Sequence, residues 1–173
     1  MQTSVDRFQF LRGDLRGSRR GIRPPWSRPE ARFIDLCERC SECLHACPNG
    51  IIENGPGGYP VVNFTHGFCT FCGDCVKACS HEALRFPADP TIPPWMLEVA
   101  IDSSCLSLNG VVCRSCGDIC EEAAIRFKPQ TGGRAVPLSD PSACTGCGEC
   151  VSVCPSHSVT ITPIKTIRHT SKT

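Results

Sequence analysis

Sixteen cysteines fall into four groups of four along the 173 residues of the chain. Three groups have the spacing C-x2-C-x2-C-x3-C, whereas in the third group the first gap is stretched to seven residues. Thiolates at this spacing are typical ligands of a [4Fe-4S] cluster. The groups are Cys37, Cys40, Cys43, Cys47; Cys69, Cys72, Cys75, Cys79; Cys105, Cys113, Cys116, Cys120; and Cys144, Cys147, Cys150, Cys154. Since no cysteine is left over, the sequence predicts sixteen iron ligands and four clusters.

Other uses of cysteine fit the sequence less well. Zinc sites take two well-separated C-x2-C pairs, and disulfides are typical of secreted chains. The chain shows no Sec-type signal and no apolar run long enough to span a membrane. Arg19-Arg20 begins like a twin-arginine signal but leads into Arg23-Pro24-Pro25-Trp26 instead of an apolar helix. We therefore expect a cytoplasmic protein whose cysteines bind iron.

The third group departs from the pattern of the others. Residues 106–112 separate Cys105 from Cys113, and we expect this loop to leave the third site more exposed and its cluster the most labile. Four clusters are therefore expected, or three if this motif is unoccupied.

Short segments around the groups alternate between helix-like and strand-like composition. A β-prone run follows each fourth cysteine, and another precedes each of the later groups. These runs are residues 50–52, 59–64, 83–86, 97–101, 124–127, 135–138 and 159–162. The predicted fold is α+β, with two tandem bacterial ferredoxin-like modules built from four strand–cluster loop–helix–strand repeats.

The fourth cysteine of each group is expected to cross between sites, because in two-cluster ferredoxins it ligates the other cluster. In the first module, Cys79 would join the first group and Cys47 the second. In the second module, Cys154 would join the third group and Cys120 the fourth. A nested arrangement that joins the first repeat to the fourth stays open.

Composition divides the chain into five segments. These are a disordered basic arm (1–30), the first module (31–86), a Pro-rich linker (87–96), the second module (97–162) and a basic tail (163–173). Only 40% of residues are hydrophobic even with cysteine counted, so we expect cluster binding to stabilise the fold.

The arm is the predicted docking segment for a protein partner. It carries seven arginines against three acidic residues, and Arg19, Arg20, Arg23 and Trp26 are the candidate contact residues. The alternatives are a solvated tail and, for Pro24-Pro25-Trp26, packing back on the first module. No nucleic-acid recognition fold accompanies this charge. The sequence also shows no nucleotide-binding loop and no acid–base or nucleophile pair, so we predict no enzymatic activity.

The whole chain resembles the NapF family, the ferredoxin-type accessory proteins of periplasmic nitrate reductase systems. The resemblance rests on residues 19–27, on residues 57–64 and on the seven-residue gap of the third group. It implies a cytoplasmic protein that binds the precursor of the nitrate reductase catalytic subunit and assists its maturation before export, at the iron–sulfur site. An electron-transfer ferredoxin that relays single electrons is the main alternative, and a redox sensor at the third site is a further one.

Overall fold

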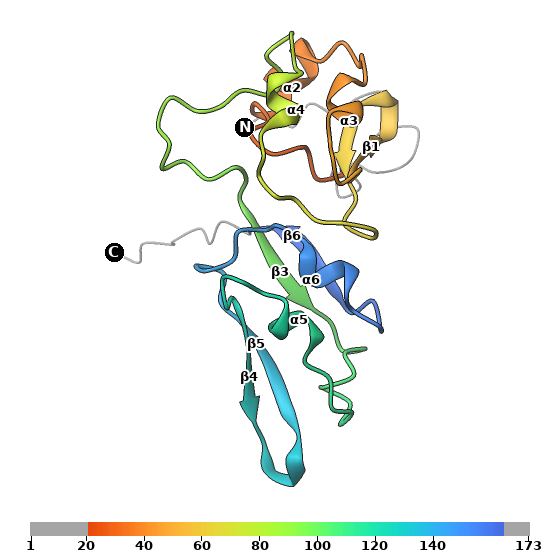
Figure 1. Ribbon diagram of the computed structural model, residues 1–173, viewed down its shortest axis with the longest axis vertical. Helices are drawn as coiled ribbons and strands as arrows, with labels where there is room; N and C mark the ends of the chain where they lie inside the picture. Colours follow the sequence, from red (N-terminus) through yellow and green to blue (C-terminus); the bar gives the residue numbers. More distant parts are fainter. Residues whose placement is uncertain (1–20, 165–173) are drawn as a thin grey trace, which may run out of the picture.

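Residues 21–164 of the computed structural model are described here, and they form two small modules arranged along the long axis of the molecule (Figure 1). The first module contains α2 (Glu30–Leu36), α3 (Glu42–His45), β1 (Ile52–Asn54), η1 (Pro56–Gly58), β2 (Pro60–Val62) and α4 (Asp74–Lys77). The second contains β3 (Leu97–Ile101), α5 (Ser115–Asp118), β4 (Ile125–Pro129), η2 (Thr131–Gly133), β5 (Ala135–Ser139), α6 (Glu149–Ser152) and β6 (Val159–Pro163).

The second module consists of two antiparallel strand pairs and two short helices. The outer pair joins the first and last strands, with Leu97 of β3 opposite Pro163 of β6. The inner pair is the β4–β5 hairpin, in which Ile125 lies opposite Ser139. Leu97, Val99, Val159 and Ile161 are buried, as the alternation of apolar side chains on a half-buried strand requires. The predicted strand runs are confirmed here, each to within a residue or two.

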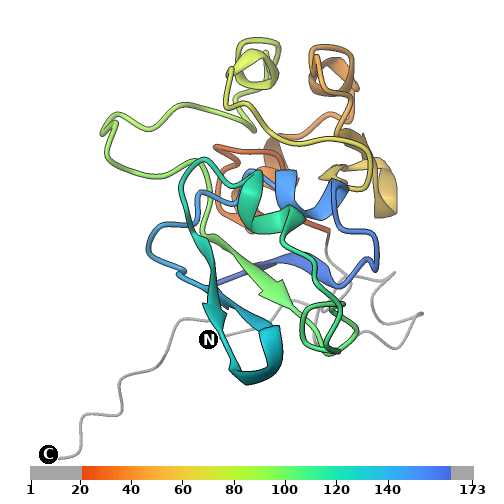
Figure 2. The ribbon, with the colours of Figure 1, turned by 60° about the horizontal axis from the view of Figure 1, so that its bottom comes forward.

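The first module repeats this connectivity with shorter elements. Its inner pair is β1 with β2, where Ile52 lies opposite Val62. Its outer pair is reduced to one bridge, Ser27 with Leu84, so the strand predicted over residues 83–86 is wrong in extent. Helices α3 and α4 lie side by side at the outer edge of this module (Figure 2).

The predicted arm differs from the structure, because residues 21–30 pack against the first module. The Val62 N–H donates to the Ile22 carbonyl at 2.7 Å, and Pro24 is buried. The Arg23 guanidinium donates to Glu30 Oε1 at 2.9 Å and lies 4.8 Å from the centroid of the Phe33 ring. Helix α2 begins at Glu30, directly after Pro29, so the module starts before residue 31. Arg19 and Arg20 lie outside the described residues.

Aromatic side chains join the two modules at the end of the linker. The Trp95 indole N–H donates to the Thr145 carbonyl at 2.9 Å. The Trp95 ring meets Phe64 and Phe71 edge to face, with centroids 5.9 and 5.8 Å apart. The Cys69 N–H donates to the Cys147 carbonyl at 2.8 Å. The second and fourth cysteine groups therefore meet at this interface.

Gly148 allows the close approach of the modules. Its φ of +85° is left-handed, and a Cβ there would overlap the Phe64 ring. Gly133 has a similar φ of +73° but nothing within 4 Å, so it makes a matched control.

We expect Gly148→Ala to destabilise the protein more than Gly133→Ala does. Both substitutions strain a left-handed residue by about 1–2 kcal/mol, and only Gly148→Ala adds the overlap with Phe64, which costs a further ~1–3 kcal/mol. The midpoint of thermal unfolding, followed by circular dichroism, should fall further for Gly148→Ala. Equal midpoints for the two variants would show that the close contact between Gly148 and Phe64 does not affect the stability of the protein.

Candidate iron–sulfur centres

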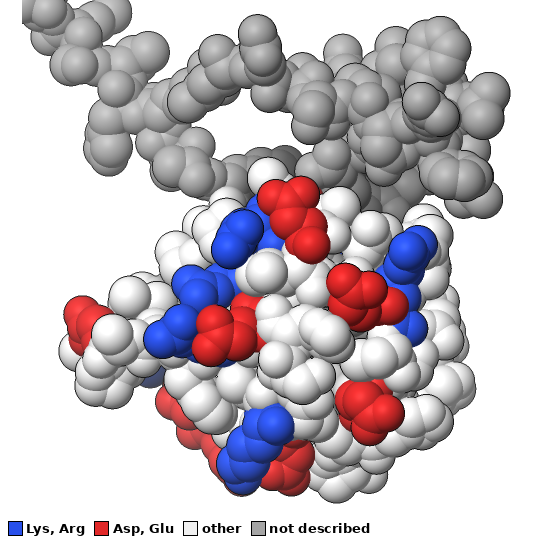
Figure 3. Space-filling model, turned by 90° about the horizontal axis from the view of Figure 1, so that it is seen from above, with Lys and Arg blue, Asp and Glu red and all other residues white. Residues whose placement is uncertain are grey.

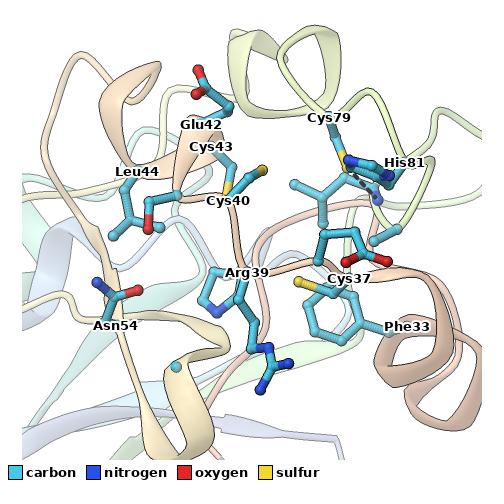
Figure 4. Close-up of a pocket in the computed structure, with 16 residues that line it drawn as sticks. Phe33, Cys37, Arg39, Cys40, Glu42, Cys43, Leu44, Asn54, Cys79 and His81 are labelled. Atoms are coloured by element: carbon cyan, nitrogen blue, oxygen red, sulfur yellow. Dashed lines mark hydrogen bonds between the residues drawn. The ribbon is translucent and has the colours of Figure 1, made fainter.

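Cys37, Cys40 and Cys43 line one cavity together with Cys79, which comes from the second cysteine group (Figure 4). The first three follow α2 and run into α3, while Cys79 follows α4. Burial raises the pKa of the Cys43 thiol to about 11, and the nearby Cys37 and Cys79 thiolates raise it as well. The four thiols thus form one electrostatically coupled set.

A second cavity brings Cys47 to Cys69, Cys72 and Cys75. Burial raises the pKa of Cys75 to about 12, with Cys69 and Cys47 among the contributing thiolates. The exchange of Cys47 and Cys79 between the two cavities is the crossing expected from the spacing.

The thiols of the second module are exchanged in the same way. Burial raises the pKa of Cys116 to about 11, and the neighbouring thiolates that raise it include Cys105 and Cys154. Burial likewise raises the pKa of Cys150 to about 12, with Cys147, Cys144, Cys116 and Cys120 as its charged neighbours. Burial also raises the pKa of Cys147, and the Cys120 thiolate contributes to this shift. Cys154 therefore lies with the third group and Cys120 with the fourth.

The loops that carry the cysteines have a repeated backbone geometry. Left-handed residues precede and follow the second cysteine in the first, second and fourth groups, and one lies three residues after the fourth cysteine in all four groups. The residues are Arg39, Ser41 and Gly50; Phe71, Gly73 and Glu82; Ala123; and Gly146, Gly148 and His157. A left-handed residue beside right-handed neighbours turns successive N–H groups into a concave anion site, a geometry common around iron–sulfur clusters.

The donor sets fit a cubane cluster better than a single metal ion. Within residues 21–164, no three His, Cys, Asp or Glu side chains converge as ligands of one ion. In a cubane each thiolate binds a different iron, so the sulfurs surround a volume. Backbone N–H groups also point at sulfur, from Phe71 to Cys69 and from Leu84 to Cys79, both at 3.4 Å. Such contacts stabilise the negative charge of ligated thiolates.

The third site is not more exposed than the others, contrary to the expectation from its long loop. Cys105 and Cys116 are buried and Cys113 is half-buried, whereas Cys40 of the first group is exposed. The loop itself reaches solvent, with Val112 85% exposed. The Ser107 hydroxyl donates to the Ala135 carbonyl, which ties the loop to β5 beside the buried Cys105.

Cys154 is the thiol whose surroundings differ most from those of the others. Burial alone would raise its pKa, but hydrogen bonds from the hydroxyls and backbone N–H groups of Ser158 and Ser156 lower it to about 7. The sequence interpretation did not single out these serines. Alignment of the four groups on their fourth cysteine would have shown a polar residue where the others have Ile51, Ala83 and Ala124.

Comparison with known families agrees with this geometry. Residues 36–84 match a family described as a 4Fe-4S dicluster domain, and residues 111–158 match a second family of the same description. Two such domains in tandem define a ferredoxin-type protein that carries [4Fe-4S] clusters. Within the described residues no helix has both the length and the apolar character needed to cross a membrane.

The similarity to curated proteins extends over nearly the whole chain. The ferredoxin-type protein NapF of Escherichia coli K12 is 41% identical over 92% of this chain and 96% of its own. NapF of Haemophilus influenzae is 42% identical over 94% of this chain and 96% of its own. The methylamine utilization ferredoxin-type protein MauM of Methylorubrum extorquens is 34% identical over 84% of this chain and 73% of its own. The chain belongs to the NapF family of ferredoxin-type proteins, and none of these relatives is named as an enzyme.

Proposed function

We propose that this protein is an iron–sulfur accessory protein that binds the cytoplasmic precursor of the periplasmic nitrate reductase catalytic subunit and assists its maturation before export. The step assisted is assembly or reduction of the iron–sulfur site of the precursor. Membership of the NapF family supports the proposal, since the resemblance links this family to periplasmic nitrate reductase systems. The observation that carries it is the pair of cysteine-lined cavities in the first module, joined to the cysteines of the second module by the hydrogen bond from Cys69 to Cys147.

The sixteen cysteines would hold four [4Fe-4S] clusters in the crossed sets described above. When bound, these clusters would supply one-electron transfer. The protein supplies the rest: its thiols give up their protons, its apolar side chains exclude water, and its backbone N–H groups stabilise sulfur charge. We also propose that the four groups are copies of one repeat, since a left-handed residue recurs at the same place after each of them.

The hydrogen bond between Cys69 and Cys147 favours a second candidate function, electron relay between redox partners. It places the second and fourth sites next to each other across the module interface. The first and third sites would then lie at opposite ends of a four-site chain. An accessory protein that reduces its client needs the same path, so the two functions differ in the partner and not in the centres.

Docking is assigned to residues before 21. Arg23 is held by Glu30 and the Pro60 carbonyl, and Trp26 packs on Phe86 with ring centroids 5.0 Å apart. Both side chains, which the sequence suggested as partner contacts, thus take part in contacts within the first module. Acidic and basic side chains are interspersed over the face of the first module in Figure 3. This leaves Arg19 and Arg20 as the proposed contact residues.

Capture of the precursor under anaerobic conditions tests the proposal. The full-length holoprotein should retain the unexported precursor, whereas a chain lacking residues 1–20 should retain much less at unchanged iron content. Replacement of Arg19 and Arg20 by Gln should weaken capture more than the matched replacement of Arg7 and Arg12. Equal capture by all variants would remove the docking assignment. A holoprotein that retains no precursor but passes electrons to soluble partners would establish the relay instead.

A further inference from the structure

Two serines contact the sulfur of Cys154. Ser158 Oγ lies 3.4 Å and Ser156 Oγ 3.6 Å from Cys154 Sγ, and the two hydroxyl oxygens are 3.1 Å apart. The Ser158 residue is 1% exposed, and with Ser107 it makes up the buried polar residues of the described chain. A buried hydroxyl needs a hydrogen-bond partner, and these contacts supply the partners of Ser158.

Ser158 occupies a position that is apolar in the other three groups. The residue four places after the fourth cysteine is Ile51, Ala83 or Ala124 elsewhere, and all three are buried. The same turn of backbone therefore brings a hydroxyl to sulfur at one site and a hydrocarbon group at the others. Ala83 and Ala124 show that the turn forms without the hydroxyl.

The direction of these hydrogen bonds follows from the chemistry of the ligand. A cysteine that binds iron has lost its proton, so its sulfur is only an acceptor. Ser158 must then donate to Cys154. Ser156 donates either to Ser158, which strengthens the Ser158 donor, or directly to the same sulfur. In both arrangements the Ser158 hydroxyl hydrogen, which carries a partial positive charge, points at the thiolate.

We propose that Ser158, supported by Ser156, raises the reduction potential of the third-site cluster, the one held by Cys105, Cys113, Cys116 and Cys154. Hydrogen bonds to ligand sulfur are among the factors that set the potential of such clusters. Reduction adds one electron without making or breaking a bond, and a donor at sulfur stabilises the added negative charge. The inference rests on the crossed ligand sets of the proposed function but not on the identity of the partner.

The hydroxyl at Ser158 would thereby favour reduction of the third site. Its neighbour, the fourth site, adjoins the first module through Cys147 and has Ala124 in place of the serine. This one difference in hydrogen bonding favours the third site, away from the module interface, as the acceptor of an electron.

Redox titration of the anaerobic holoprotein, followed by the electron paramagnetic resonance of its reduced clusters, tests the inference. Dithionite supplies the electrons. In Ser158→Ala, one of the four clusters should titrate at lower potential while the other three stay unchanged. Ser156→Ala should lower the same potential by less. The reciprocal variant Ala124→Ser adds a hydroxyl beside Cys120 and should raise the potential of a different cluster.

Two further measurements separate hydrogen bonding from a structural effect. In deuterium oxide, pulsed resonance should show exchangeable deuterons coupled to the affected cluster, and the contribution of the Ser158 hydroxyl should be lost in Ser158→Ala while those of the backbone N–H groups remain. Cys113→Ser, which alters a ligand of the third site, should perturb the same cluster signal. Unchanged potentials in Ser158→Ala would overturn the proposal, as would a shift in a signal other than the one that Cys113→Ser perturbs. A deuteron spectrum of Ser158→Ala identical to that of the parent protein would also overturn it.

Discussion

Removal of iron and sulfide will unfold both modules, and the apoprotein will show no cooperative thermal transition. The helices that carry ligands have four residues each, and β1 and β2 have three, lengths that form no stable structure alone. Among residues 21–164, five of the twenty buried residues of the hydrophobic core are themselves cysteines: Cys75, Cys105, Cys116, Cys150 and Cys154. Ligation therefore supplies much of the folding free energy, as in other small metal-binding domains.

Circular dichroism and amide hydrogen exchange, before and after oxidative chelation, measure this effect. The apoprotein should lose its protected amides and its sharp thermal transition. Chelator alone, without oxidant, is the control and should leave the brown holoprotein intact. An apoprotein that retains the same cooperative transition would contradict the expectation.

Reloading the apoprotein should release protons and become more favourable as pH rises. In the unfolded apoprotein the cysteines have their ordinary pKa of about 8.5, so most of them keep their protons at neutral pH, and burial on folding raises the pKa values of Cys75 and Cys150 further, to about 12. Each must lose its proton to bind iron. The amount of cluster reconstituted at a limiting iron concentration should therefore increase with pH from 7 upward.

Cys79→Ala will remove the first cluster and spare the second, although Cys79 belongs to the second cysteine group. The cavity of Cys37, Cys40 and Cys43 contains Cys79, and the cavity of the remaining second-group cysteines contains Cys47. With a full complement of sixteen iron atoms for sixteen cysteines in the parent protein, the variant should lose about a quarter of its iron.

The matched variants are Cys40→Ala and Cys72→Ala, because both residues are exposed and each belongs to one group. The resonance spectrum of reduced Cys79→Ala should lack the same signal as Cys40→Ala and keep the one lost in Cys72→Ala. If Cys79→Ala instead matched Cys72→Ala, each group would bind its own cluster and the crossed sets would be wrong.

The ligand sets and much of the fold follow from sequence because both depend on local spacing. The runs at residues 97–101 and 159–162 are rich in β-prone residues, and they form β3 and β6. The exchange of Cys47 and Cys79 follows from the extra residue before each fourth cysteine, which moves that thiol to the far side of a short helix.

Packing of Pro24-Pro25-Trp26 on the first module was one alternative for the arm, but the contacts of Arg23 were not predictable from composition. By composition, Arg23 belongs to a segment that is expected to be basic and solvated. Its partner Glu30 lies seven residues away, with a proline-rich turn between them. Only the folded chain brings the guanidinium onto Phe33 and into contact with the Pro60 carbonyl. The burial of Cys105 was missed for a similar reason, since the contact of Ser107 with Ala135 joins residues 28 positions apart.

The crossed ligand sets also determine the order in which the sites become complete as the ribosome makes the chain. The first two sites are complete once Cys79 has emerged, while the third waits for Cys154, 75 residues later. At about 5–20 residues per second this is a delay of roughly 4–15 s. During that interval the first module of the growing chain is ready for loading. The third site still lacks at least one of its four ligands. Cluster insertion would thus begin at the N-terminal module while the C-terminal one is still being made.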